Sequence, residues 1–220
     1  MNTNSNSYTV IYASVMVVIV AFLLAFVASS LKEQQDKNVE LDKMKQILSA
    51  LNIHDVEDPE ATFNEYVKED QILNLNCTVK SHKGGFKVSA KSEDELPLYV
   101  CNVNGETKYV IPVSGAGLWG PIWGYVGLNA DKNTVYGVYF SHEGETPGLG
   151  AEIATEKFQS RFPGKHVLEN GDVALGVEKN GKVSKPEYQV DGISGGTITS
   201  KGVDAMLKGC LSRYKGFLNN

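Results

Sequence analysis

The run DGISGGTITS, residues 191–200, gathers side chains and backbone that could carry chemistry. It holds four hydroxyl groups, one carboxylate and three glycines ahead of a segment with helical periodicity. Amides at a helix N-terminus lack intrahelical partners, and the helix dipole favours negative charge there. The run is therefore suited to bind a phosphate. A helix cap made by Thr199 or Ser200 is an equally good interpretation, and the two are compatible.

A second glycine-rich loop, HEGETPGLG at residues 142–150, follows a predicted strand and precedes a predicted helix. Its glycines permit close backbone approach to a planar ligand, and its amides suit an anion or an electron-rich ring edge. An ordinary strand-to-helix turn with Glu145 in solvent is the simpler alternative, since such loops alone are weak signals.

The other reactive side chains are scattered. No Ser-His-Asp or Cys-His arrangement is evident, and His142 is expected to satisfy a backbone group near its loop. Neither histidines nor cysteines occur at metal-ligand spacing, so we predict no metal site. Buried free thiols are favoured over a Cys77–Cys101 disulfide. The residues concerned are His54, His82, His142, His166, Cys77, Cys101 and Cys210.

The elements that must position the two loops form an α+β pattern. Short segments rich in Val, Tyr and Ile predict strands, and a polar turn at residues 129–133 predicts a β-hairpin. Apolar residues at spacings of three and four predict two later helices. We expect a mostly antiparallel sheet with helices packed on it. The expected strands are 75–82, 96–103, 108–115, 125–128 and 134–140, and the expected helices are 148–162 and 199–217.

The N-terminal segment has a different composition. No charged residue precedes Lys32, and Tyr8 to Leu31 is almost wholly apolar. About 20 such residues span a bilayer as a helix, and a cleaved signal peptide fits less well because no basic n-region is present. We predict a transmembrane anchor at 1–31, a helical stalk and entry region at 32–74, with a helix starting at Asp58-Pro59, and a domain at 75–220.

The net charge of −5 lies entirely outside the apolar segment. A mildly acidic domain lacks the clustered Lys and Arg that nucleic-acid binding requires, so no nucleic acid is expected. Lysines after the span, beginning with Lys32, would place the domain in the cytoplasm by the positive-inside rule. That rule weakens for long translocated domains, so the residues leave the side open.

The two loops together resemble a known family. DGISGGTITS resembles the flavinylation motif Asp-x-x-Ser/Thr-Gly-Ala-Thr-x-Ser/Thr, whose Thr after Gly-Ala is esterified to the phosphate of FMN. HEGETPGLGAEI resembles the other signature of this FMN-binding domain family. GAGLWGPIWGYVGLNADKNTVYGVYF, residues 115–140, resembles its branch in Na+-translocating NADH:quinone oxidoreductases, namely the C subunit. The likeness extends from about Gly115 to the C-terminus. One departure is Gly196, where Ala is usual.

The resemblance implies roles for individual residues. Thr197 would be the phosphoester-bearing residue, and Asp191 would be recognised by a flavin transferase that takes FMN from FAD using Mg²⁺. Trp119, in the GLW element, would be a neighbour of the flavin ring, although buried packing is an open alternative. The phosphate surroundings would be Ser194, Gly195 and Thr199, and the loop against the isoalloxazine ring would be Glu145, Thr146, Gly148 and Leu149.

The resemblance also implies a function. It predicts an electron-relay subunit that passes electrons from an iron-sulfur centre to a second flavin subunit, in a complex that oxidises NADH, reduces quinone and exports Na+. The protein would supply position and electrostatics to the flavin, with no catalytic site of its own. The predicted location is the bacterial inner membrane, single-pass, with the flavin domain periplasmic.

Three alternatives remain open. One is the G subunit of an Rnf-type ferredoxin:NAD+ oxidoreductase, which shares both signatures; the GLWGPIWGY run favours the quinone-linked system. Another is a membrane-anchored FMN-binding domain of another redox system. The third is a non-redox interaction module in which both glycine-rich loops are structural.

Overall fold

The computed structural model describes residues 5–220, so the first four residues of the predicted anchor lie outside the described part. The chain divides into two compact units, one ending at Lys43 and the other covering Met44–Asn220. Helix α1 (Asn6–Ala50) begins in the first unit and ends in the second. The apolar segment therefore continues as helix past Leu31, as expected.

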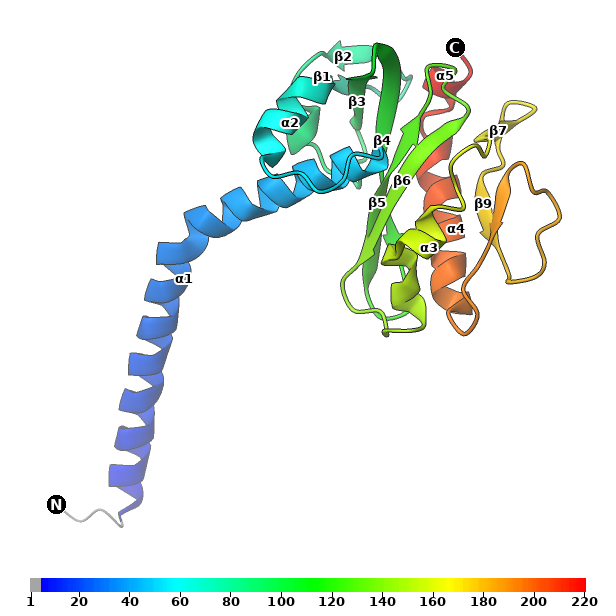
Figure 1. The fold of residues 1–220 in the computed structure, drawn as a ribbon. Helices are drawn as coiled ribbons and strands as arrows, with labels where there is room; N and C mark the ends of the chain where they lie inside the picture. Colours follow the sequence, from blue (N-terminus) through cyan, green and yellow to red (C-terminus); the bar gives the residue numbers. More distant parts are fainter. Residues whose placement is uncertain (1–4) are drawn as a thin grey trace. The chain divides into compact units, whose positions relative to one another are not determined.

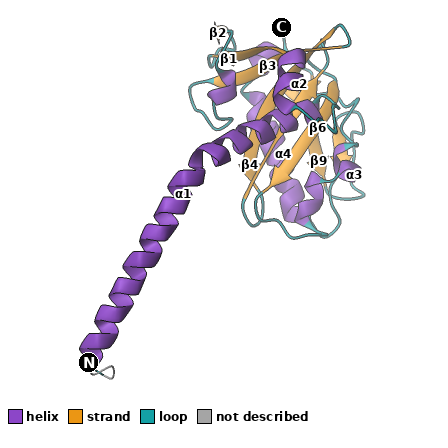
Figure 2. Ribbon diagram, turned by 60° about the vertical axis from the view of Figure 1, so that its left-hand side comes forward, coloured by secondary structure: helices purple, strands orange, loops and turns teal. Residues whose placement is uncertain are grey.

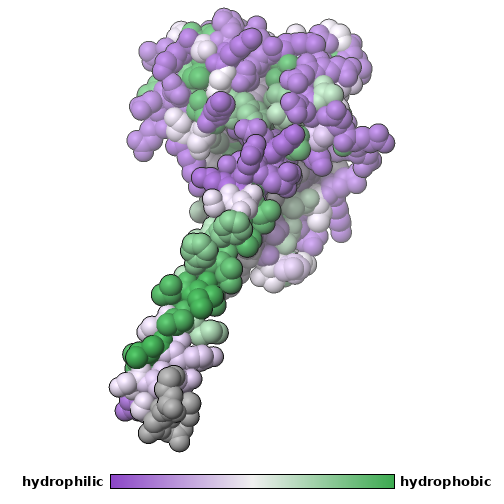
Figure 3. All heavy atoms as spheres, turned by 90° about the vertical axis from the view of Figure 1, so that its left-hand side faces the viewer, coloured by the Kyte–Doolittle hydropathy of each residue, from purple (hydrophilic) through white to green (hydrophobic). Residues whose placement is uncertain are grey.

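The first unit is a helix with exposed apolar side chains. Its most apolar 18-residue window has a mean hydropathy of 2.9, and this helix is long and apolar enough to cross a membrane. Figure 3 shows these residues as a mostly green stretch of hydrophobic side chains. Such a surface is stable in hydrocarbon and costly in water, so the helix is suited by its length and composition to a membrane.

The second unit is built on a six-stranded sheet in the order β2-β1-β3-β4-β5-β6 (Figures 1 and 2). Every neighbouring pair in this sheet is antiparallel. The predicted fold class, α+β with a mostly antiparallel sheet, is confirmed. The strands are β1 (Val67–Leu73), β2 (Val79–Ser81), β3 (Leu96–Val103), β4 (Glu106–Ala116), β5 (Pro121–Leu128) and β6 (Val135–His142).

The smaller elements surround this sheet. Helix α2 (Pro59–Tyr66) precedes it, with the Asp58 carboxylate accepting hydrogen bonds from two first-turn amides. The later helices are α3 (Glu156–Gln159), α4 (Thr197–Ser212) and α5 (Lys215–Leu218), with 3-10 turns η1 (Gly85–Lys87) and η2 (Gly150–Ala154). Two short sheets pair β7 (Leu168–Glu169) with β8 (Asp172–Val173), and β9 (Gly176–Glu178) with β10 (Gln189–Asp191), the latter pair in parallel.

The main sheet has a hydrophobic core on each face, because successive side chains of a strand point to opposite sides. In β3, Leu96 and Leu98 join one core, whereas Tyr99 and Cys101 join the other. The first core packs against α4, which crosses the sheet in Figure 1. The two cores thus give the domain three layers.

The last turn of α1 and the residue after it, within the second unit, pack into the other core. Ile47, Leu48 and Leu51 are almost completely buried there. A methyl group on Gly127 would lie 2.3 Å from the carbonyl oxygen of Ala50, so glycine at this position of β5 lets the helix end approach the sheet. This end of the helix is therefore part of the second unit and of its core.

Several predicted boundaries were wrong. Strand β1 lies before Leu75, where no strand was expected, and its sequence VKEDQIL is too polar to show a strand pattern. The predicted helix 148–162 is instead a 3-10 turn followed by one short helix, because Thr155 between them is extended. The final helix begins at Thr197 and breaks before α5 rather than running from 199 to 217.

Candidate functional site

Thr197 is the first residue of α4 and its side chain is half-buried. The residue before it, Gly196, occupies the N-cap position and offers no side-chain acceptor. The predicted cap by Thr199 or Ser200 is therefore wrong: the Ser200 hydroxyl accepts a hydrogen bond from the Ile193 amide instead. Within residues 5–220, the amides of residues 197–199 have no hydrogen-bond acceptor. This helix start is open to an external anion.

Two glycines shape the turn that enters α4. Gly195 has φ +81°, a left-handed conformation that disfavours side chains, and a methyl group there would lie 2.7 Å from Cδ2 of Leu149. Gly196 has an ordinary φ of −103°, and a methyl group there would lie 3.1 Å from its nearest neighbour, Cγ2 of Ile193. Alanine, usual at this motif position, thus nearly fits here. Leu149 in turn lies directly against the turn that carries Thr197.

Glu145 is buried, with 5 % of its surface exposed, which overturns the simple alternative of a solvated turn. Its Oε1 accepts a hydrogen bond from the Trp119 amide at 2.9 Å, and its Oε2 accepts one from the Thr199 hydroxyl at 2.5 Å. Burial raises the pKa of this carboxyl, but the hydrogen bonds from Thr199, Trp119 and Leu118 outweigh burial and lower it below the ordinary value. The carboxylate is thus ionised at neutral pH.

Two further glycines make room for this carboxylate. A methyl group on Gly117 would lie 2.4 Å from Oε1 of Glu145, and one on Gly150 would lie 2.2 Å from Oε2. Such distances are impossible for real side chains, so the carboxylate sits in a slot between two backbone segments. Gly150 was expected, with the other glycines of its loop, to admit a planar ligand, and Gly117 had no expected role. Their position around the Glu145 carboxylate is evident only in the folded chain.

The loop 142–150 is held by its own hydrogen bonds. The Glu145 amide donates to Nδ1 of His142 at 3.2 Å, so His142 does satisfy a backbone group as predicted. The carbonyl oxygen of Thr146 accepts from the amides of Leu149 and Ala151. Thr146 and Gly148 themselves are exposed, and Gly148 has φ +75°.

Large apolar side chains gather around this network and remain exposed. Trp119 is 69 % exposed, so the alternative that it packs in the interior is wrong. Exposed apolar groups at one place on a soluble surface indicate a binding surface. The other members of this group are Leu118, Leu149 and Ile198.

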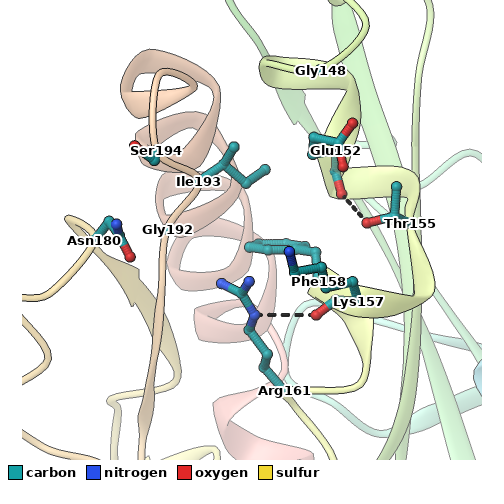
Figure 4. Close-up of a pocket in the computed structure, with 10 residues that line it drawn as sticks. All are labelled: Gly148, Glu152, Thr155, Lys157, Phe158, Arg161, Asn180, Gly192, Ile193 and Ser194. Carbon is teal, nitrogen blue, oxygen red and sulfur yellow. Dashed lines mark hydrogen bonds between the residues drawn. The ribbon is translucent and has the colours of Figure 1, made fainter.

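A cavity of about 370 Å³ opens beside these loops (Figure 4). Gly148 and Ser194 contribute to it from the two predicted loops, whereas Thr197 does not line it. Figure 4 shows the Arg161 and Phe158 side chains between the 192–194 segment and α3. Lys157, Arg161 and Asn180 give the cavity polar and cationic walls, and none of these residues was predicted.

Asp191 lies in β10, at the beginning of the hydroxyl-rich run. Its Oδ1 accepts a hydrogen bond from the Gly181 amide at 2.7 Å, and its carbonyl oxygen accepts one from Nη1 of Arg161 at 2.7 Å. Asp191 thereby fixes the turn around Gly181. Its predicted recognition by a transferase remains a prediction.

Comparisons with known proteins identify the family of this chain. A family model described as an FMN-binding domain matches residues 117–212. The C subunit of the Na(+)-translocating NADH-quinone reductase of Haemophilus ducreyi is 32 % identical, over 94 % of this chain and 90 % of that protein.

Solved structures match as well. The crystal structure of the C subunit of the Na(+)-translocating NADH-quinone reductase from Parabacteroides distasonis is 44 % identical and superimposes with a TM-score of 0.82, covering 86 % of this chain and 98 % of that one. Shewanella oneidensis NqrC has the same fold, with a TM-score of 0.71 at 23 % identity.

Fold and site together define an FMN-binding domain that follows an apolar helix. The network around Glu145 and the opening of α4 both lie within the matched residues. The chain belongs to the family formed by the C subunits of Na(+)-translocating NADH-quinone reductases.

Proposed function

We propose that this chain is the electron-relay subunit of a Na+-translocating NADH:quinone oxidoreductase and carries FMN as a phosphoester on Thr197. The observation that carries the proposal is the start of α4. There, three consecutive amides, beginning at Thr197, lack an acceptor within the described residues, and the N-cap glycine supplies none. A phosphate on the Thr197 hydroxyl would be adjacent to these donors and to the positive end of the helix dipole.

The residues present fit FMN. Leu149 lies against the Gly195 turn, and Trp119 and Ile198 offer exposed apolar surface near it for an isoalloxazine ring. FMN, when bound, supplies the redox chemistry, and the chain's own residues hold and orient it. The phosphoester keeps the cofactor from dissociating, which suits a carrier that is oxidised and reduced repeatedly. The remaining contacts proposed are Ser194, Gly195, Thr199, Glu145, Thr146 and Gly148.

The subunit would work in a larger assembly. We infer an iron-sulfur electron donor and a second flavin subunit as acceptor, with a flavin transferase recognising Asp191 during maturation. The apolar helix would anchor the chain in the bacterial inner membrane, with residues 1–31 as the anchor, 32–74 as the entry region and 75–220 as the flavin domain. We place the flavin domain in the periplasm. An alkaline phosphatase fused after Asn220 should then be active.

The direct test is mass spectrometry on full-length protein from a host that flavinylates its proteins. The peptide containing Thr197 is expected to gain the mass of one FMN less water. Thr197→Val should abolish flavin fluorescence after denaturation, whereas Ser194→Ala should retain it, because Ser194 lacks the ester in this proposal. An unmodified Thr197 peptide from that host contradicts the proposal.

An Rnf-type subunit and a non-redox interaction module have less support. The relatives named above are subunits of Na(+)-translocating NADH-quinone reductases, and no observation favours an Rnf-type G subunit. The FMN-binding domain match likewise disfavours a non-redox interaction module.

A further inference from the structure

Three segments far apart in the sequence meet at the carboxylate of Glu145. The loop after β4 donates the Trp119 amide, and the first turn of α4 donates the Thr199 hydroxyl. The third segment is the 142–150 loop, which provides the carboxylate itself. Glycines at 117 and 150 leave the space that the carboxylate occupies.

We propose that Glu145 is a positioning residue of the flavin site, which fixes the first turn of α4 and holds a buried negative charge beside the cofactor. This inference rests on the proposed function, and it assigns a role to a residue for which the resemblance implies only ring contact. Its two parts, position and charge, are separable by substitution.

The positional part follows from the way α4 begins. The N-cap residue Gly196 makes no side-chain hydrogen bond, so the helix start lacks the usual local support. The hydrogen bond from the Thr199 hydroxyl to Glu145 supplies a support from outside the helix. Thr197 lies in that same turn, so the direction of its hydroxyl depends on this contact.

The charge part follows from the burial of the Glu145 carboxylate with no Lys or Arg beside it among the described residues. Within the described residues, Glu145 forms no ion pair with Lys or Arg, and its stabilisation comes from hydrogen-bond donors. A buried charge acts over longer distances than an exposed one because solvent screens it less. A negative charge near a flavin opposes the arrival of an electron and so lowers its reduction potential.

Isosteric substitution separates the two parts. Glu145→Gln keeps the shape and the acceptor for the Trp119 amide but removes the charge. Thr199→Val removes the link to α4 and leaves the charge. Glu143→Gln is the matched control, because Glu143 lies in the same loop, is exposed, and carries the same charge.

The measurements are the FMN content per chain and the spectroelectrochemical reduction of the flavin in full-length protein. At a fixed potential, Glu145→Gln should raise the ratio of reduced to oxidised flavin about tenfold. Thr199→Val should lower the FMN content at a limiting maturation time, and Glu143→Gln should change neither quantity. A purely structural role would leave the potential of the loaded Glu145→Gln protein unchanged.

The other possible results also test the proposed role of Glu145. Unchanged potential and unchanged FMN content in both variants overturn the inference while the wild-type protein still carries FMN on Thr197. If Glu145→Gln fails to fold, the FMN content of Thr199→Val is the test. A lowered FMN content supports the positional role of Glu145, and an unchanged content overturns the inference. Wild-type protein without FMN on Thr197 overturns the proposed function and this inference together.

Discussion

Replacing Gly150 with alanine probes the packing around the Glu145 carboxylate. The added methyl group would lie 2.2 Å from Oε2 of Glu145 and 2.4 Å from the Thr199 hydroxyl oxygen. The φ angle of Gly150 is not in the left-handed region, so the backbone itself accepts alanine. The effect must therefore come from collision with the carboxylate and its partner.

The size of the effect can be worked from two contributions. Overpacking a filled interior costs about 1–3 kcal/mol. Displacing the carboxylate weakens a hydrogen bond to a charged group, which contributes about 1.5–3 kcal/mol. We expect Gly150→Ala to lower the free energy of unfolding by about 3–5 kcal/mol.

The assay is denaturant unfolding of the full-length protein in detergent, followed by circular dichroism. Gly209→Ala is the matched control, since Gly209 is exposed in α4 and an added methyl group would meet nothing within 4 Å. That variant should gain about 0.5–1 kcal/mol from helix propensity. If Gly150→Ala unfolds within about 0.5 kcal/mol of the wild-type protein, the carboxylate slot does not exist as described.

Three further results are expected. Because its pKa is lowered in the folded state, the Glu145 carboxylate stabilises the fold above its unfolded-state pKa, and this stabilisation is lost as pH falls through the folded-state pKa. The free energy of unfolding should therefore fall less steeply below about pH 4.5 in Glu145→Gln than in the wild-type protein. Gly195→Ala should lower the thermal midpoint while Gly196→Ala leaves it nearly unchanged, because only the former combines φ +81° with a 2.7 Å contact. Cys101, whose pKa burial raises to about 12, should resist alkylation at pH 8 until the protein is denatured, as peptide mass spectrometry would report.

Local patterns predicted the elements whose residues carry their own signal. Asp58-Pro59 marks a helix start through a capping carboxylate and a preset φ, and the polar turn at 129–133 marks the β5–β6 hairpin. Strand β1 carries no such signal, because most of its side chains are polar. Its strand conformation comes from pairing with β2 and β3. The predicted helix at 148–162 has apolar residues at helical spacing, yet Thr155 is extended and divides the segment into η2 and α3.

The candidate site likewise has residues that local sequence predicts and residues whose environment it does not predict. Its motif residues could be recognised along the chain, because the proposed attachment residue Thr197 and its neighbours lie in one short run, residues 191–200. The burial of Glu145 could not be predicted, because its hydrogen-bond donors, Trp119 and Thr199, come from other segments of the chain. Solvent exposure of Trp119 was equally unpredictable, because an indole ring is compatible with either environment.

The burial of Ile47, Leu48 and Leu51 has a practical consequence for preparing the domain without its anchor. Each of these side chains contributes about 1.5–3 kcal/mol, so cutting the chain after Leu51 would remove stabilisation comparable to that of a whole domain. A soluble truncation that begins at or before Met44 keeps this core filled. Where to cut is therefore decided by the last turn of α1 and not by the end of the apolar segment.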